Sequence, residues 1–183
     1  IQHIPYSFFS ISNFKNHFKI KTMKEMHHKF IEVFSHRNDI SQRREIIETT
    51  FKTLLKHYRI NLPEHLIQQQ EQIILKNTRK NPDYHVYKAQ KNFSKIIRLL
   101  AEKQLQESVL IDHLSYQENI ALNPLDVASY FNFLQRPRTK EFICFDLPAT
   151  QMNGQEQPLP AEIVNQSCLR EKTLNHIINY LTL

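Results

Sequence analysis

The chain has 183 residues, a net charge of +6 and a single glycine, Gly154. So little glycine excludes Gly-rich phosphate loops, the dinucleotide-binding fingerprint and the G-x-S-x-G nucleophile turn, while abundant Lys, Glu, Gln, Leu and Ile predict an all-α fold. The positive charge favours acidic partners such as RNA, ribosomes or anionic proteins, although a modestly basic surface without such a partner explains it equally well.

The first long pattern predicts a helix over residues 22–58. An aromatic-rich segment, 6–20, precedes it and is compatible with a short helix, and Thr22 with Glu25 forms a capping-box pattern. Apolar residues then recur in steps of three and four over five repeats. The helix would span roughly 55 Å at 1.5 Å per residue, and a break near Asn38-Asp39 is the alternative.

Two similar corners follow, and each joins an extended apolar-x-apolar link to a proline that opens a new helix. Ile60 and Leu62 precede Pro63 in the first corner, and Ile120 and Leu122 precede Pro124 in the second. Proline suits the first helical position and pushes the preceding residue towards extended geometry. The corners therefore predict two helical hairpins. The predicted helices are 63–78, 84–116 and 124–135, with a turn at 81–83.

The C-terminal third is predicted to be irregular before a last helix. Arg136-Pro137 breaks the preceding helix, Phe142–Phe145 are compatible with an extended piece, and 148–160 contains three prolines and the one glycine, which predicts a loop. Apolar periodicity resumes in a closing helix over about 160–181.

The first corner resembles a known family. The run from Ile60 to Ile67, Ile-Asn-Leu-Pro-Glu-His-Leu-Ile, is similar to the apolar-x-Val-Pro-Glu-x-Leu-Val pattern of bacterial trigger factors. The run 89–93 stands where the family has Ala-x-x-x-Val-Lys, and 169–178 looks like its closing Glu-Lys-Val-Leu-x-x-Leu helix. The resemblance covers about 22–183, the family's C-terminal chaperone domain. The Asn-Pro of the second corner and the prolines of 136–160 depart from the family, which leaves the path of the second arm open.

The resemblance implies a long-helix scaffold with two helical-hairpin arms, about 59–95 and 110–150, that cradle unfolded or nascent polypeptide without nucleotide or other cofactor. The family's ribosome-binding and prolyl isomerase domains need glycines that this chain lacks. The chain begins without Met and without a signal-peptide pattern, so we expect a piece of a longer protein. On this interpretation, residues 1–21 connect an upstream domain to the helical domain, and ribosome contact and isomerase activity belong to the longer parent protein.

Three alternatives stay open: a SurA-type periplasmic chaperone core, a basic helical RNA- or ribosome-binding module, and a purely structural scaffold. Long amphipathic arms also predict weak self-association into a homodimer. Two cysteines without C-x-x-C spacing are typical of a reduced, cytoplasmic protein. No apolar run is long enough to predict a membrane span.

The expected functional feature is an apolar surface, because burial of apolar area is non-directional and suits a binder of many sequences. In the second arm we select Tyr130, Phe131 and Phe133, with packing on Phe142 and Phe145 as the alternative. In the first arm Ile67 and Ile74 are candidates, with hairpin packing against Ile96 and Leu100 as the alternative. The candidate surface residues are Ile67, Ile74, Tyr130, Phe131, Phe133, Phe142 and Phe145, and the structural corner residues are Ile60, Leu62, Pro63 and Pro124.

Neither a metal site nor a catalytic residue is predicted. The adjacent His27 and His28 would point about 100° apart on a helix. No H-E-x-x-H motif or i, i+4 histidine pair occurs, and the cysteines lack matching ligands nearby in the sequence.

Overall fold

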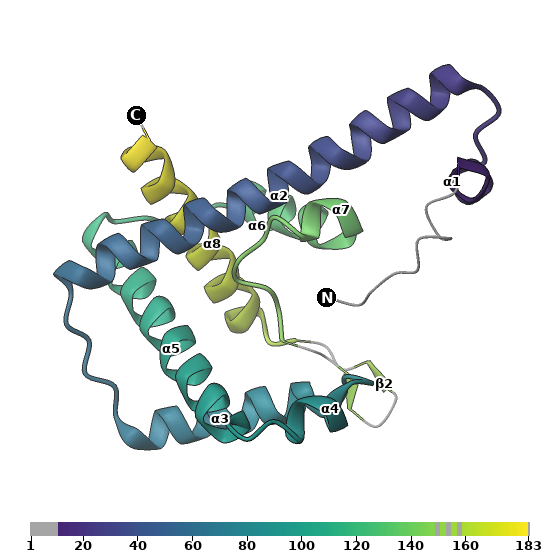
Figure 1. Ribbon diagram of the computed structural model, residues 1–183. Coiled ribbons are helices and arrows are strands. Elements are labelled where there is room, and N and C mark those ends of the chain that lie inside the picture. The colour runs from purple at the N-terminus through teal and green to yellow at the C-terminus, as the bar shows by residue number, and fades with distance from the viewer. Residues whose placement is uncertain (1–10, 149–150, 153–154, 157–158, 183) are drawn as a thin grey trace. The chain divides into compact units, whose positions relative to one another are not determined.

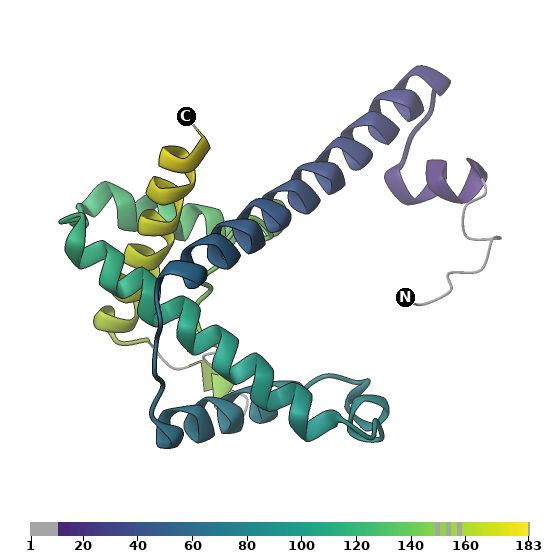
Figure 2. The same ribbon diagram turned by 60° about the vertical axis from the view of Figure 1, so that its left-hand side comes forward.

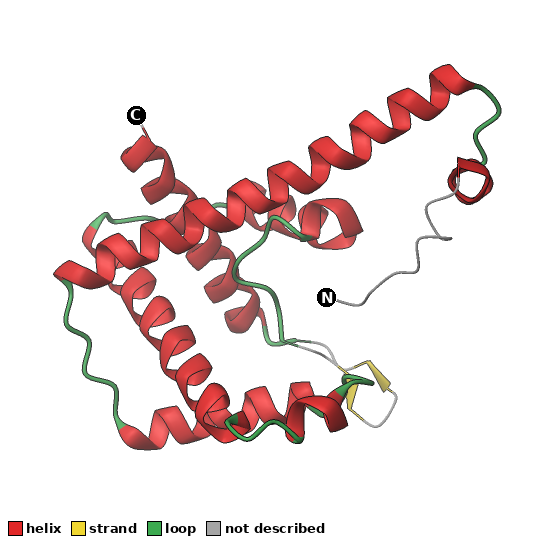
Figure 3. Cartoon of the chain, in the orientation of Figure 1, coloured by secondary structure: helices red, strands yellow, loops and turns green. Residues whose placement is uncertain are grey.

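The computed structural model describes residues 11–148, 151–152, 155–156 and 159–182. Helices form nearly all of its regular structure, which confirms the all-α class (Figures 1 and 3). The two-residue strands β1 and β2 pair antiparallel within a segment predicted to be a loop. The elements are α1 Ile11–Phe18, α2 Met23–His57, α3 Glu64–Thr78, α4 Tyr84–Lys88, α5 Phe93–Gln117, α6 Pro124–Gln135, α7 Pro137–Lys140, β1 Gln151–Met152, β2 Gln155–Glu156 and α8 Ala161–Thr182.

Two compact units, residues 1–45 and 46–183, divide the chain within α2 rather than at the predicted 21/22 boundary. The helix itself is continuous from Met23 to His57, as predicted, without a break at Asn38-Asp39. In the first unit the predicted capping box is confirmed: the Thr22 N–H donates to Glu25 Oε2 over 3.1 Å, and the Glu25 N–H donates to Thr22 Oγ1 over 3.2 Å. Backbone donors from Lys21 and Thr22 lower the pKa of the Glu25 carboxyl.

The second unit contains two separate hydrophobic cores. The body core consists of buried side chains from α2, α5 and α8, and the arm core lies between α3 and α5. Helix α5 contributes to both, so it joins the α3–α5 hairpin, called the arm here, to the body (Figures 1 and 2). The body core is Phe51, Leu110, Ile111, Leu114, Leu174, Ile177 and Ile178, and the arm core is Ile67, Ile74, Ile97 and Ala101.

The first corner joins the two cores through alternate residues of its extended link. Ile60 packs against the body core, and Leu62 packs against the arm core. Alternate side chains of an extended segment point to opposite sides, so one short link contacts both. Pro63 stands one position earlier than predicted: it is the N-cap residue of α3, with ψ of 135°, and not its first helical residue.

The second corner depends on two asparagines, and the first of them takes a position where a glycine would be usual. Helix α5 ends in a left-handed residue, Asn119, with φ of 51°. The N–H of Ile120 donates to the Ser115 carbonyl over 2.9 Å, which completes a Schellman-type ending. Asn123 then caps α6: its side chain accepts from the Asp126 N–H, the Asp126 carboxylate accepts from the Asn123 N–H, and Pro124 occupies the first turn.

Three consecutive charged residues of α8 hold three different segments. Arg170 forms a bidentate pair with Asp112 of α5, with distances of 2.7 and 2.6 Å. The buried Glu171 carboxylate accepts the N–H groups of Cys144 and Phe145 at 2.9 and 3.1 Å. Lys172 Nζ lies 2.7 Å from Asp126 and 2.8 Å from the Ala121 carbonyl oxygen, at the start of α6. Successive helical residues point about 100° apart, so the triplet can contact all three.

Three sequence predictions about this unit are wrong. The helix predicted over 84–116 is interrupted between Lys88 and Phe93, where four polar or small residues provide no large apolar side chain to bury. Residues 142–145 form turns and bends and not an extended piece, because Glu171 binds two of their N–H groups. Helix α6 packs on α7 and α8, so 110–150 does not form a second free-standing hairpin.

We expect Asn123→Ala to lower the free energy of unfolding by about 1 kcal/mol, because it removes the side-chain acceptor of the α6 cap. Chemical denaturation would measure the change. Asn92→Ala is the matched control, since Asn92 is the N-cap residue of α5 but its side chain makes no cap hydrogen bond. Equal losses in the two variants would contradict the proposed role of the Asn123 side chain.

Candidate functional site

The first-arm candidates are buried, so their predicted exposure is wrong. Ile67 and Ile74 retain 6% and 8% of their accessible surface. They pack on Ile97 and Ala101 of α5 within the arm core. Hairpin packing, the alternative interpretation, is therefore confirmed, although the predicted partners Ile96 and Leu100 are themselves exposed. The prediction missed the rotation of α5 by one residue, which sequence periodicity does not resolve at a helix start.

One side of the arm carries a network of charges. Arg98 of α5 forms a bidentate pair with Glu64 of α3, with distances of 2.7 and 2.8 Å. Glu102 and Glu71 lie 3.1 and 3.9 Å from the same guanidinium. Hydrogen bonds from Arg98 lower the pKa of the Glu64 carboxyl. The exposed ion pairs contribute little to stability individually, but they collect the arm's carboxylates on one side.

The opposite side of the arm is apolar and exposed. Ile73 and Ile96 each directly precede a buried isoleucine, so both are displaced by about 100° in the same rotational direction. Arg98 follows Ile97 and is displaced the other way. Helices α3 and α5 run in opposite directions within the hairpin (Figure 2). In two antiparallel helices that face each other, the residues just before the core positions lie on the same side of the pair, so Ile73 and Ile96 share one side of the arm. The apolar face, as we name it, comprises Ile73, Ile96, Leu99 and Leu100, which expose 52%, 48%, 55% and 39%.

The apolar face continues the stripe by which α5 enters the body core. Leu99 and Leu110, eleven residues apart, differ by about 20° around the helix, and Ile96 and Leu114, eighteen apart, by about 0°. Leu110 and Leu114 are buried in the body core, whereas Leu99 and Ile96 remain about half exposed. A side of α5 that is used for packing in its second half is thus left open in its first half.

A half-buried carboxylate, Glu107, lies between these two halves of the stripe. Desolvation by burial raises the pKa of the Glu107 carboxyl, Lys103 opposes that shift, and Glu48 adds to it. The nearest ammonium, on Lys103, is 3.8 Å away. Among the described residues, Glu107 is the one acidic side chain that helical periodicity places on this side of α5 between Ile96 and Leu114.

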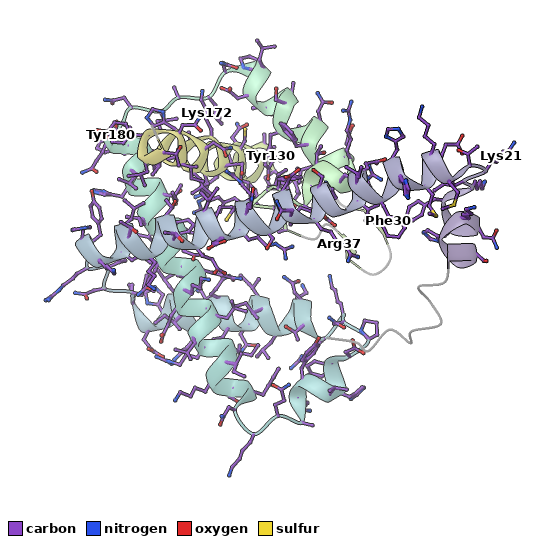
Figure 4. The ribbon with its side chains drawn as sticks, turned by 45° about the horizontal axis from the view of Figure 1, so that its top comes forward. Lys21, Phe30, Arg37, Tyr130, Lys172 and Tyr180 are labelled. Atoms are coloured by element: carbon purple, nitrogen blue, oxygen red, sulfur yellow. The ribbon has the colours of Figure 1, made fainter. Side chains whose placement is uncertain are left out.

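The second-arm candidates separate into buried and exposed residues. Tyr130 is 4% exposed, and its hydroxyl donates to the Phe145 carbonyl oxygen over 2.6 Å, so its prediction as a surface residue is wrong (Figure 4). Burial raises the pKa of the Tyr130 phenol above its ordinary value. Phe131 and Phe133 remain exposed at 39% and 50%, while Phe142 and Phe145 are half-buried. Phe145 packs edge-on against Phe51 of the body core.

Sequence reasoning missed the apolar face. Sequence periodicity places Ile96 and Leu100 in hairpin packing and does not indicate Leu99 or Ile73 as surface candidates. The available signal was the length of the α5 apolar stripe, which extends beyond what one partner helix can cover. Exposed apolar side chains on α5 and α3 therefore replace Ile67 and Ile74 as the candidate binding residues of the arm.

The described part of the chain offers no cluster of side chains that is suited to a metal ion. No group of three or more His, Cys, Asp or Glu side chains lies close enough there to hold a metal ion. Cys144 and Cys168 are not joined by a disulfide, and burial raises the pKa of the Cys168 thiol. No described helix combines the length and apolarity needed to cross a membrane.

Comparison with known proteins adds no family: no protein-family model matches the chain, and neither a curated protein nor a solved structure is significantly similar to it.

We expect Tyr130→Phe to lower the free energy of unfolding by roughly 1 kcal/mol, because the part-buried hydrogen bond to the Phe145 carbonyl oxygen is lost. Thermal or urea unfolding would measure this loss. Tyr180→Phe, at a tyrosine that is 78% exposed, is the control and should change nothing. An unchanged Tyr130→Phe variant would show that the hydrogen bond does not stabilise the α6 packing.

We expect Glu107→Gln to be more stable than the parent chain at pH 7. A carboxyl whose pKa is raised by folding loses stability as the pH rises above its unfolded value, near 4.5. The advantage of the glutamine should therefore vanish below about pH 4, where the parent carboxyl is protonated in both states. Urea unfolding from pH 3.5 to 8 would measure the difference. The exposed Glu48→Gln variant should gain less, and a gain independent of pH would contradict the argument.

Proposed function

We propose that this chain holds unfolded polypeptide segments on the apolar face of its arm, as the substrate-cradling domain of a trigger-factor-like, ATP-independent chaperone. The observation that carries the proposal is the uncovered continuation of the body-core stripe along α5, through Ile96, Leu99 and Leu100. Monomeric proteins rarely leave a contiguous apolar surface open unless it binds something.

The chemistry of this face suits clients of varied sequence. Its side chains are aliphatic, and the carboxylates of the arm that bind Arg98 lie on the other side. Aliphatic burial contributes about 25 cal/mol per Å² regardless of the direction of approach. Weak, reversible binding of many apolar segments follows, and it needs no nucleotide.

The exposed Phe131 and Phe133 of α6 form a second candidate contact in the same unit. The two phenylalanines are two residues apart and therefore point to different sides of the helix. We assign them a supporting role, because α6 packs on α8 and does not form a free arm. By the same resemblance, ribosome binding and prolyl isomerisation belong to other domains of the family, and not to these residues.

We expect the double substitution Leu99→Gln with Leu100→Gln to weaken binding of a permanently unfolded probe, reduced and carboxymethylated α-lactalbumin, roughly thirtyfold. Each leucine that a bound client partly covers contributes about 1 kcal/mol, and glutamine preserves helix propensity. Fluorescence anisotropy of the labelled probe would measure affinity at low and high salt, and affinity should survive high salt.

The matched control is Leu125→Gln with Leu181→Gln, two leucines outside the arm that are 77% and 49% exposed. This control should bind the probe as the parent chain does. Equal weakening in both variants, or no binding by the parent chain, would overturn the proposal. Binding abolished by high salt would favour an electrostatic contact over an apolar one.

A further inference from the structure

The end of the arm concentrates the positive charge of the chain. We define the arm tip as residues 76–95, which include the last residues of α3, the whole of α4 and the start of α5 (Figure 2). The tip has six Lys or Arg residues and one acidic residue, Asp83. Its net charge of +5 leaves +1 for the rest of the chain, which has a net charge of +6 in total. The basic residues are Lys76, Arg79, Lys80, Lys88, Lys91 and Lys95.

These cations are exposed and uncompensated. All six are exposed, and none forms an ion pair with another side chain of the described residues. Elsewhere in the unit the contrast is clear, since Arg98, Arg170 and Lys172 each bind a carboxylate within 3 Å. A dense group of like charges without counter-charges repels itself and attracts a polyanion.

An exposed aromatic ring lies among the cations. Tyr87 of α4 is 40% exposed, and Val86 beside it is 66% exposed. Tyr84, by contrast, packs edge-on against Phe93, with Lys88 Nζ lying 6.0 Å from its ring centre. Tyr84 therefore fixes α4 on the start of α5, and Tyr87 remains available to a ligand.

We propose that the arm tip binds single-stranded RNA, with Lys80, Lys88 and Lys91 contacting phosphates and Tyr87 stacking on a base. Basic side chains that follow a strand, with an aromatic ring on which a base can stack, are the usual elements of sequence-tolerant single-strand binding. An acidic peptide would satisfy the cations but would leave the ring without a partner. A membrane is less well matched, because α4 has five residues and adjacent Val86 and Tyr87 do not form one apolar face.

The test is the affinity of the full chain for a fluorescein-labelled 20-nucleotide oligouridine, measured by anisotropy from about 50 to 300 mM salt. The tip variant carries Lys80→Gln, Lys88→Gln and Lys91→Gln. The control removes the same charge from exposed sites outside the arm with Lys52→Gln, Lys56→Gln and Arg59→Gln. We expect the tip variant to bind at least tenfold more weakly at 100 mM salt and the control to stay within about twofold.

The salt dependence gives a second readout. Each phosphate contact on a single strand contributes about 0.7 to the slope of log affinity against log salt, so the tip variant should lose about 2 from the slope. Tyr87→Ala should weaken binding about tenfold without changing the slope.

The proposal would be overturned if the parent chain failed to bind RNA at 100 mM salt. It would also be overturned if the tip variant and the charge-matched control lost affinity equally, because net charge alone would then explain binding. Binding of phosphatidylserine vesicles or of poly-glutamate through the tip, without binding of RNA, would assign the tip to a membrane or to an acidic peptide instead.

Circular dichroism of the tip variant should match that of the parent, because the three lysines make no ion pairs. Holding of unfolded polypeptide by the apolar face should be retained in this variant, so the two proposals fail independently.

Discussion

Helix α5 is the constraint on which the rest of the larger unit depends, because one helix belongs to two cores. Its first half packs Ile97 and Ala101 against α3, and its second half packs Leu110, Ile111 and Leu114 against α2 and α8. A continuous backbone hydrogen-bond ladder connects the halves, so the arm cannot rotate about its axis without disturbing the body core. The link through Ile60 and Leu62 adds a second connection between the same two cores. The apolar face is therefore held at a fixed rotation with respect to the body-core stripe, which allows an exposed surface to persist without collapsing onto its own core.

The distribution of polar groups shows how an open apolar surface coexists with a stable hairpin. Carboxylates that could border the exposed aliphatic side chains are paired with Arg98 on the other side of the arm. Glu107, the one exception, lies where the stripe enters the body, and its raised pKa reflects the cost of its desolvation. In α8 the charged side chains bind other segments to the helix. Arg170, Glu171 and Lys172 direct three segments onto one helix, and α6 is fixed to α8 where a second arm was predicted.

Much of the fold could be predicted from the sequence, and the differences have physical causes. The long α2, the extent of α6 and the Thr22–Glu25 cap follow from local patterns of apolar spacing and capping residues. The interruption at 89–92 was missed because polar residues are good helix formers, and only the absence of a packing partner opposes them. Tyr130 was misassigned because its burial depends on a partner fifteen residues away, the Phe145 carbonyl, which α8 positions through Glu171. Ile67 and Ile74 were misjudged for a related reason: helix periodicity gives the apolar side of a helix but not which half of it a neighbour covers.

The arm combines two surfaces with opposite responses to salt. Apolar contact with Leu99 and Leu100 strengthens slightly as salt rises, whereas attraction of a polyanion to the tip weakens steeply. The apolar face lies on α3 and α5, whereas the proposed RNA contacts lie on α4 and the turns on either side of it. The charged side around Arg98 lies opposite the apolar face. A polypeptide and an RNA could therefore occupy the arm together without competing for the same side chains. An RNA bound at the tip would therefore bring the apolar face close to any polypeptide attached to that RNA. Binding of the polypeptide by the apolar face would still need no contact between the polypeptide and the tip.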